Sequence, residues 1–309
     1  MKLVFMGNPQ FAVSSLKRII ESSYSLQAIV CNPPKWSGRG KTKNLTPVGE
    51  FANRYRLSLL QPQLLDDNNF ILSLKKLKPD YFLVVGFKIL PDSILEIPTK
   101  GSINLHASLL PFYRGAAPIQ RAIMNGDKNT GLTTFYIRRV VDTGSILMQS
   151  SIPIHAKDDF GTLSEKMSVK GAELLMQTLD SLYCNAIIPK EQNHSQATLA
   201  PKIREKDCRI NWNDSAKKIN YQIRGLSPNP GAFTNWNGTR VRILQSEIID
   251  LGEHKLPGEV VNCNRKQLVI QTGNGQIKLL RLQREGKNIL EIQDFLNGTK
   301  LEIGDRFDS

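Results

Sequence analysis

Apolar and polar residues follow two alternating patterns through the first 185 positions of the chain. Continuous apolar runs are typical of strands buried on both faces of a parallel sheet, and apolar residues three and four positions apart predict amphipathic helices. Strands are expected at 2–6, 26–31, 57–60, 81–85, 103–106, 131–137 and 145–154. Helices are expected after residue 9 and at 47–55, 66–77, 119–124 and 162–182. This alternation predicts an α/β, Rossmann-like domain with a mainly parallel sheet.

The pattern changes after residue 200. Short alternating strands are expected at 240–244, 258–262, 267–271 and 276–282, after a helix around 216–223. Turn residues at 237–238 and 273–275 separate them, which is typical of a small antiparallel barrel. The segment that starts at residue 186 is polar and irregular and predicts a linker. We therefore expect a catalytic domain at 1–185, a linker at 186–205 and a β-barrel domain at 206–309.

The most informative stretch is 101–120, G-S-I-N-L-H-A-S-L-L-P-F-Y-R-G-A-A-P-I-Q. Asn104 and His106 are two positions apart in a predicted strand, so their side chains should share one face. An amide can hold an oxyanion and an imidazole can move a proton near neutral pH, which suits chemistry at a carbonyl. The residues alone leave an alternative open, in which Asn104 caps a turn and His106 is a core histidine.

The motif N-x-H-x-S-L-L-P followed by R-G-A-A-P-I-Q resembles the signature of the methionyl-tRNA formyltransferase family. The shorter motif is shared with other enzymes that use 10-formyltetrahydrofolate. The opening F-M-G-N-P-Q-F-A at 5–12 is similar to the family's F-M-G-T-P-x-F-A, with Asn8 in place of threonine. Residues 224–233 are similar to the start of the family's second domain. The resemblance implies a formyltransferase domain followed by an OB-like β-barrel that helps to bind tRNA.

The resemblance also implies the reaction and its site. The formyl donor would be 10-formyltetrahydrofolate, and the acceptor would be the α-amino group of methionyl initiator tRNA. Asn104 and His106 would be catalytic, together with Asp142 of a D-T-G motif, which would pair with the histidine. By itself, Asp142 is more typical of an Asx turn before Gly144. The residues implied to bind the folate are Ser108, Leu109, Leu110, Pro111, Phe87 and Leu90.

Two loops depart from the family pattern. Gly86 and Phe87 stand where the family has tyrosine and glycine, before a shared I-L-P. Ahead of Asp142, the family resembles M-D-x-G-L, whereas this chain has Arg138 and Val140 in place of the acid and the glycine. Both loops are expected to border the folate, so the shape of that pocket should differ.

The chain is basic throughout, with a net charge of +13 and a sequence pI near 9.6. Residues 1–200 hold 23 Lys and Arg against 15 Asp and Glu, and residues 201–309 hold 18 against 13. The segment 32–46 has no acid and no apolar periodicity, but carries Lys35, Arg39, Lys41 and Lys43 beside a tryptophan. Such a loop suits docking on nucleic acid, although a solvated basic loop is the alternative. By resemblance, this loop would bind the acceptor arm of tRNA.

Other features exclude several classes of protein. Cys31, Cys184, Cys208 and Cys263 are far apart and have no flanking histidine, so we expect free thiols and neither a zinc site nor a disulfide framework. No apolar run is long enough to span a membrane, and no signal peptide precedes the first strand. We expect a cytoplasmic monomer without a metal. Two alternatives stay open: a formyltransferase acting on a small nucleotide, and a non-catalytic nucleic-acid-binding protein of the same fold.

Overall fold

A computed structural model describes residues 1–37, 42–249 and 255–308, which form two compact units. The first unit comprises residues 1–116, 129–153 and 164–200, and the second comprises residues 117–128, 154–163 and 201–309. The segment from 186 to 200, which the sequence suggested as part of a linker, belongs to the first unit. Each unit has its own hydrophobic core and is described by itself.

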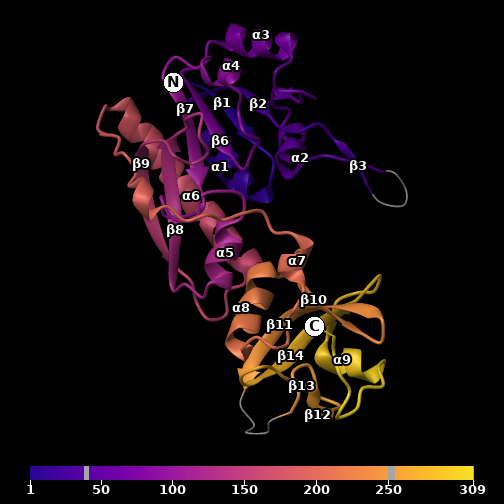
Figure 1. Ribbon diagram of the computed structural model, residues 1–309. Helices are drawn as coiled ribbons and strands as arrows, with labels where there is room; N and C mark the ends of the chain where they lie inside the picture. The colour runs from indigo at the N-terminus through magenta and orange to yellow at the C-terminus, as the bar shows by residue number, and fades with distance from the viewer. Residues whose placement is uncertain (38–41, 250–254, 309) are drawn as a thin grey trace. The chain divides into compact units, whose positions relative to one another are not determined.

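A seven-stranded sheet forms the centre of the first unit, in the order β5-β2-β1-β6-β7-β8-β9 (Figure 1). Its strands are β1 (Lys2–Gly7), β2 (Ser25–Val30), β5 (Leu59–Leu60), β6 (Tyr81–Val85), β7 (Gly101–His106), β8 (Asn129–Tyr136) and β9 (Ile146–Pro153). The first five strands in this order, β5, β2, β1, β6 and β7, run parallel to one another. Strands β8 and β9 are each antiparallel to the strand before them in the sheet. The predicted α/β fold with a mainly parallel sheet is confirmed.

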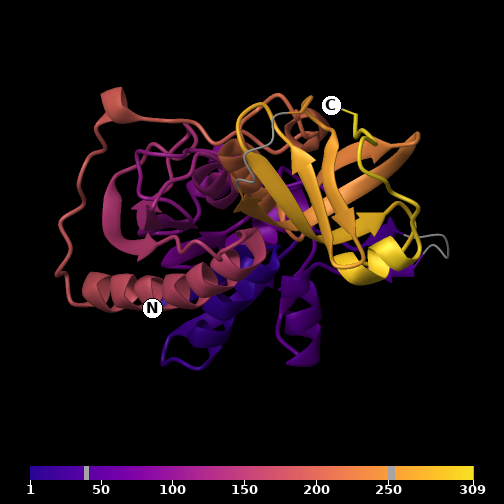
Figure 2. The ribbon, with the colours of Figure 1, turned by 90° about the horizontal axis from the view of Figure 1, so that it is seen from below.

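Helices cover both faces of this sheet. The helices with residues in the first unit are α1 (Gln10–Ile20), α2 (Pro47–Arg54), α3 (Asn68–Leu77), α4 (Asp92–Leu95) and α6 (Phe160–Tyr183). Thr178 of α6 shares a 2.8 Å hydrogen bond with Thr134 of β8, and α6 lies alongside α1 (Figure 2). On the opposite face, α3 and α4 pack against β1 and β6 through one cluster, whose fully buried members are Val4, Met6, Val30, Leu74, Phe82 and Ile94.

An antiparallel six-stranded sheet forms most of the second unit, in the order β10-β11-β14-β13-β12 with β15 beside β14. Its strands are β10 (Ala232–Trp236), β11 (Thr239–Ile249), β12 (Val260–Asn264), β13 (Gln267–Gln271), β14 (Gln276–Arg284) and β15 (Leu290–Glu291). The sequence analysis missed β10. Asn237 and Gly238 join it to β11 with φ of 48° and 70°, because a two-residue hairpin turn needs left-handed residues. The antiparallel β domain is confirmed, and its OB character stays a prediction.

Helices complete the core of the second unit. They are α5 (Pro118–Met124), α7 (Glu205–Cys208), α8 (Ala216–Leu226) and α9 (Ile292–Asn297). Trp212 is fully buried at the centre, and its Nε1 donates to the hydroxyl of Thr234 at 3.1 Å. Ile219 and Ile223 of α8 pack in the same cluster. The helix predicted around 216–223 is therefore confirmed by α8, and its buried residues pack in the core of the second unit.

The basic segment has more structure than the sequence indicated. Two short strands, β3 (Lys35–Ser37) and β4 (Thr42–Asn44), pair antiparallel with Lys35 opposite Asn44. The expectation of an irregular loop throughout 32–46 was therefore wrong for these residues, because a pairing of only three residues leaves no periodic signal. Lys35 is exposed. Arg39, Lys41 and the side chain of Lys43 lie outside the described part of the chain.

Among the residues that the structure describes, no helix is both long and apolar enough to cross a membrane. All four cysteines are free, as predicted: Cys31 and Cys208 are buried, Cys184 is exposed and Cys263 is intermediate.

This difference in burial predicts different thiol reactivity. Burial raises the pKa of Cys208, so less thiolate forms there at neutral pH, and the thiolate is the nucleophile. We expect iodoacetamide at pH 7.5 to alkylate Cys184 rapidly and to reach Cys208 only after denaturant is added. Peptide mass spectrometry over a time course measures both rates. Equal rates in the folded protein would contradict this account.

Candidate active site

Asn104 and His106 lie at the carboxyl end of β7, where the parallel part of the sheet meets its antiparallel part. In the register of β7 with β8, Asn104 is opposite Phe135, whose ring lies edge-on to the imidazole with centroids 6.5 Å apart. Leu105 points to the other face, towards α6, where a Cβ added to Gly171 would come within 2.8 Å of it. The prediction that Asn104 and His106 share a face is confirmed.

The imidazole of His106 is buried and held by two neighbours. Its Nε2 lies 2.9 Å from the carbonyl oxygen of Tyr113. A carbonyl can only accept, so the geometry assigns the proton to Nε2. Its Nδ1 lies 3.8 Å from Oδ2 of Asp142, within the range of an ion pair but too long for a hydrogen bond. The structure thus brings the three predicted catalytic residues to one region of the first unit.

Asp142 reaches His106 from the connection between β8 and β9. Its φ is 55°, in the left-handed region that aspartate tolerates better than most residues. Its Oδ2 accepts from the backbone N–H of Gly115 at 2.8 Å. Gly144 follows in the D-T-G motif, and a Cβ there would lie 1.7 Å from the carbonyl oxygen of Tyr136. A glycine is therefore required for this connection to close.

The amide of Asn104 has no hydrogen-bond partner among the described residues. The side chain is half-buried on the same face as His106. An unpaired amide donor beside an imidazole fits a ligand that carries a carbonyl oxygen.

The S-L-L-P residues are mainly buried within the protein itself. The hydroxyl of Ser108 donates to the carbonyl oxygen of Phe112 at 2.6 Å, and the N–H of Leu110 donates to the hydroxyl of Thr133 at 3.0 Å. Leu109 packs against Gly131. Pro111 is buried as well. These contacts fix the shape of the loop, and contact of its residues with a folate stays a prediction.

Gly86 explains one departure from the family pattern. Its φ is 60°, and a Cβ at this position would lie 2.6 Å from Cγ of Pro9. A tyrosine at residue 86 is therefore incompatible with this backbone. Phe87 instead packs partly buried against the core cluster that contains Leu90. Phe87 and Leu90, which were predicted to bind folate, therefore pack in one apolar cluster. This cluster lies on the face of the sheet that also carries Asn104.

Two ion pairs account for the arginines of the other departing loop. Arg138 pairs with Glu191 at 3.2 Å. Arg139 pairs with Asp92 of α4, directly after the I-L-P loop. Both pairs are exposed and of small energetic value. The first pair connects the loop before Asp142 to Glu191. The second pair connects the same loop to Asp92, which follows the other departing loop at 86–87.

The segment from 190 to 200 forms one side of the site, and the sequence analysis missed it. Ala200 N–H donates to the carbonyl oxygen of Arg114 at 2.7 Å, and Arg114 N–H donates to that of Thr198 at 2.9 Å. The side chain of Gln192 contacts both Arg114 and the carbonyl oxygen of Asp142. No motif marked this segment, because its residues are polar and lack periodicity.

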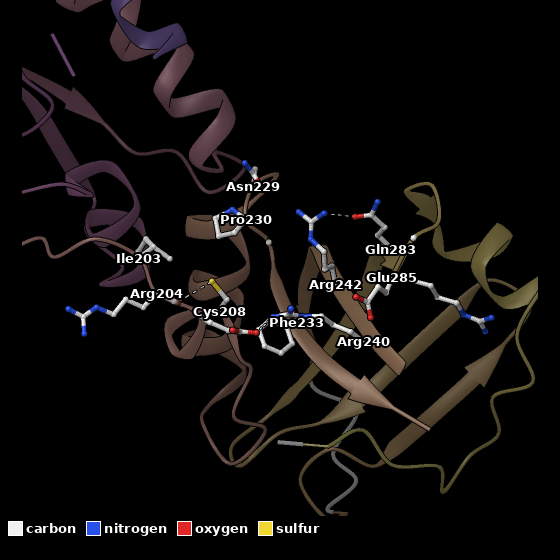
Figure 3. A pocket seen from close by; sticks show the side chains of 14 residues that line it. Ile203, Arg204, Cys208, Asn229, Pro230, Phe233, Arg240, Arg242, Gln283 and Glu285 are labelled. Carbon is white, nitrogen blue, oxygen red and sulfur yellow. Dashed lines mark hydrogen bonds and ion pairs between the residues drawn. The ribbon is translucent and has the colours of Figure 1, made fainter. Parts of the chain in front are cut away.

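The second unit has a pocket of about 540 Å³ of its own (Figure 3). The guanidinium of Arg240 lies 3.4 Å from the ring centroid of Phe233 and 2.9 Å from the carboxylate of Glu205. Arg242 donates to the carbonyl oxygen of Pro228 at 2.7 Å. The charged side chains of the lining are Arg204, Arg240, Arg242, Arg284, Glu205 and Glu285. The pocket therefore has a positive balance.

Across residues 1–37, 42–249 and 255–308, no group of three or more His, Cys, Asp or Glu is arranged to hold a metal ion.

Two family models match the chain over most of its length. The formyl transferase model matches residues 1–179, and the model of the formyl transferase C-terminal domain matches residues 202–300. The first match covers more than half of the chain and contains Asn104, His106 and Asp142. The chain belongs to the formyl transferase family.

The chain is similar to several named members of this family and to related folds. Methionyl-tRNA formyltransferase of Thermodesulfovibrio yellowstonii is 43% identical over 303 residues, which cover 98% of this chain and 97% of that protein. The structure of methionyl-tRNA formyltransferase from Clostridium thermocellum matches with a TM-score of 0.57 at 18% identity, over 82% of this chain and 95% of its own. HypX from Aquifex aeolicus, in complex with tetrahydrofolic acid, matches 98% of this chain with a TM-score of 0.67 at 16% identity. This chain spans 50% of HypX, and both structural matches show the fold alone.

Proposed function

We propose that the protein transfers the formyl group of 10-formyltetrahydrofolate to the α-amino group of methionyl initiator tRNA. The product is N-formylmethionyl-tRNA, which is used to start translation. The observation that carries the proposal is the grouping of the unpaired Asn104 amide, the His106 imidazole and the Asp142 carboxylate at one end of β7. The relative that is 43% identical over nearly the whole chain supports this acceptor over a small nucleotide.

The residues of the site suit attack of an amine on a formyl carbon. A bond forms between the amine nitrogen and the formyl carbon, and the bond from that carbon to the folate nitrogen breaks. Negative charge develops on the formyl oxygen, and the Asn104 amide can donate to it. Such a donor contributes roughly 3–4 kcal/mol in other acyl transfers. Bound folate would supply the activated formyl group. The attacking amine loses one proton and the departing folate nitrogen gains one, so the transfer balances.

His106 and Asp142 have linked roles in this proposal. The Nε2–H of His106 is bound to the Tyr113 carbonyl here, so donation to the formyl oxygen requires exchange of that hydrogen bond. Asp142 orients the imidazole from the Nδ1 side. Because Gly115 holds the carboxylate, the orientation does not depend on substrate.

Positive charge supports a tRNA partner for both units. Strand β3 carries the exposed Lys35, and the sequence continues with Arg39, Lys41 and Lys43. We propose that these residues contact phosphates near the acceptor end. In the second unit, the arginines of the 540 Å³ pocket offer further donors for phosphates. We propose that residues 206–309 form an OB-like tRNA-binding domain and that residues 1–185 carry out catalysis.

The proposal includes the oligomeric state, the folate pocket, the location and the metal requirement of the protein. The catalytic candidates all belong to one unit of one chain, which supports a monomer. Ser108, Leu109, Leu110, Pro111, Phe87 and Leu90 would shape the folate pocket through the loops described above. We propose a cytoplasmic enzyme that needs no metal, and activity that survives treatment with EDTA would agree with this.

Removal of either side chain on β7 should abolish most of the formyl transfer. We expect Asn104→Ala and His106→Ala each to lower kcat by roughly 100-fold or more, because each removes a group that acts on the developing charge. The assay is transfer of labelled formyl to Met-tRNA, with folding checked by circular dichroism. The control is His155→Ala, at an exposed histidine outside the site. Wild-type turnover in folded His106→Ala would refute the assignment.

Replacement of Asp142 should show whether this residue acts in catalysis or only forms a turn. Asp142→Asn keeps the shape of the side chain but removes the charge opposite Nδ1 of His106. We expect a large fall in kcat with little change in tRNA affinity, and no such fall for the exposed control Asp66→Asn. A variant that loses thermal stability but keeps its turnover would make Asp142 a turn residue only.

The basic hairpin can be tested through the salt dependence of tRNA binding. Each lost phosphate contact lowers the slope of log affinity against log salt by about one unit. We expect this for Lys43→Ala with all tRNAs alike, and for Arg39→Ala together with a weaker preference for initiator over elongator Met-tRNA. Lys76→Ala, at an exposed lysine of α3, is the matched control. If affinity and slope are unchanged in both hairpin variants, these cations do not contact tRNA.

A further inference from the structure

Gln192 lies where three segments of the first unit meet: 112–115, 141–144 and 190–194. Its side chain is buried, with 5% of the residue exposed. A buried amide needs partners for its donors and its acceptor, or it destabilises the fold. Its partners here belong to the two segments that bring Asp142 to His106.

The amide of Gln192 uses its whole hydrogen-bonding capacity. Its Nε2 donates to the carbonyl oxygens of Asp142 at 3.0 Å and Gly144 at 2.7 Å. Its Oε1 accepts from Nε and Nη2 of Arg114 at 3.2 and 2.6 Å. Donation to two carbonyl groups and acceptance from a guanidinium require an amide, because a carboxylate cannot donate and an apolar side chain can do neither.

These contacts act on the backbone that carries the catalytic acid. Asp142 has a φ of 55°, and a left-handed residue other than glycine persists only when its surroundings hold it there. Gln192 binds the carbonyl groups on both sides of Thr143. On its other side it binds Arg114, the residue before Gly115, whose N–H donates to the Asp142 carboxylate. One side chain therefore connects the backbone of Asp142 to the segment that orients its carboxylate.

Gln192 is itself firmly placed. Two residues earlier, Lys190 pairs with Ile146 of β9 through reciprocal backbone hydrogen bonds of 2.7 and 2.9 Å. Two residues later, Nδ1 of His194 lies 2.9 Å from Nη2 of Arg114. The segment is thus anchored to the sheet before Gln192 and to Arg114 after it.

We infer that Gln192 is a positioning residue for the catalytic pair, which holds the Asp142 backbone so that its carboxylate faces Nδ1 of His106. The inference rests on the proposed function of this site. It assigns a role to Gln192, a buried residue in the segment 186–205 that the sequence indicated only as a linker. Gln192 acts through Asp142 and His106 and does not contact the reacting atoms.

The main test is Gln192→Met, which keeps the volume of the side chain and removes every hydrogen bond. We expect kcat to fall by roughly 10- to 100-fold, because small misplacements of catalytic groups have effects of this size. The KM values for folate and tRNA should stay within about twofold of wild type. Gln196→Ala is the control, at an exposed glutamine of the same segment. Gln192→Met turnover within twofold of wild type overturns the inference.

A second variant tests the donor of the Gln192 amide separately from its acceptor. Gln192→Glu keeps an acceptor for Arg114 but sets a carboxylate against the carbonyl oxygens of Asp142 and Gly144. We expect it to lose as much turnover as Gln192→Met, because the donated hydrogen bonds position Asp142. If Gln192→Glu keeps wild-type kcat, those donated bonds are not needed and the inference fails.

A spectroscopic readout tests the same inference without any substrate. The chain has only four histidines, so the ring nitrogens of His106 can be assigned by NMR with ¹⁵N-labelled histidine and single-histidine variants. We expect the His106 ring resonances to move in Gln192→Met and to stay in place in Gln196→Ala. If the resonances move but wild-type protein does not formylate Met-tRNA, the proposed function fails and the positioning role stands. Active wild type with unmoved resonances overturns the positioning role alone.

Discussion

The candidate site depends on one placement: a carboxylate from the β8–β9 connection held opposite a histidine at the end of β7. The distance of 3.8 Å between Asp142 Oδ2 and His106 Nδ1 is set by backbone groups on each side. Gly115 N–H binds the carboxylate and the Tyr113 carbonyl binds the imidazole. Both belong to the loop after β7, so the shape of that loop decides whether acid and histidine face each other.

The topology of the sheet makes this placement possible. Strand β7 is the last parallel strand, and β8 returns antiparallel beside it. The chain therefore leaves β8 beside the amino end of β7, where Ile137 N–H donates to the carbonyl oxygen of Ser102. The connection between β8 and β9 then brings Asp142 back to His106 at the carboxyl end of β7, the end at which ligands of open α/β sheets bind. The tight approach of Gly144 to Tyr136 closes the connection.

The residues that depart from the family pattern are compatible with the placement of Asp142 opposite His106. Gly86 is required by its own left-handed backbone beside Pro9, and Arg138 and Arg139 form ion pairs with Glu191 and Asp92. The loops around the proposed folate pocket are therefore held by contacts of this chain's own residues, whereas Asn104 and His106 match the family motif. The basic charge in both units serves a separate purpose in the proposed function, the recognition of tRNA.

The sequence by itself determined the elements with strong patterns: the buried run of β6, the alternation around Asn104 and His106, and the helix around 216–223. These patterns are local, because strand and helix periods are set within a few residues. It also carried the motifs that indicate a formyltransferase. Only the tertiary structure revealed the pairing of β3 with β4, the strand β10 and the contacts of Gln192. Their partners are too few or too distant in sequence to leave a periodic signal: a three-residue pairing, a single hairpin turn, and one amide whose partners lie 48 to 78 residues away.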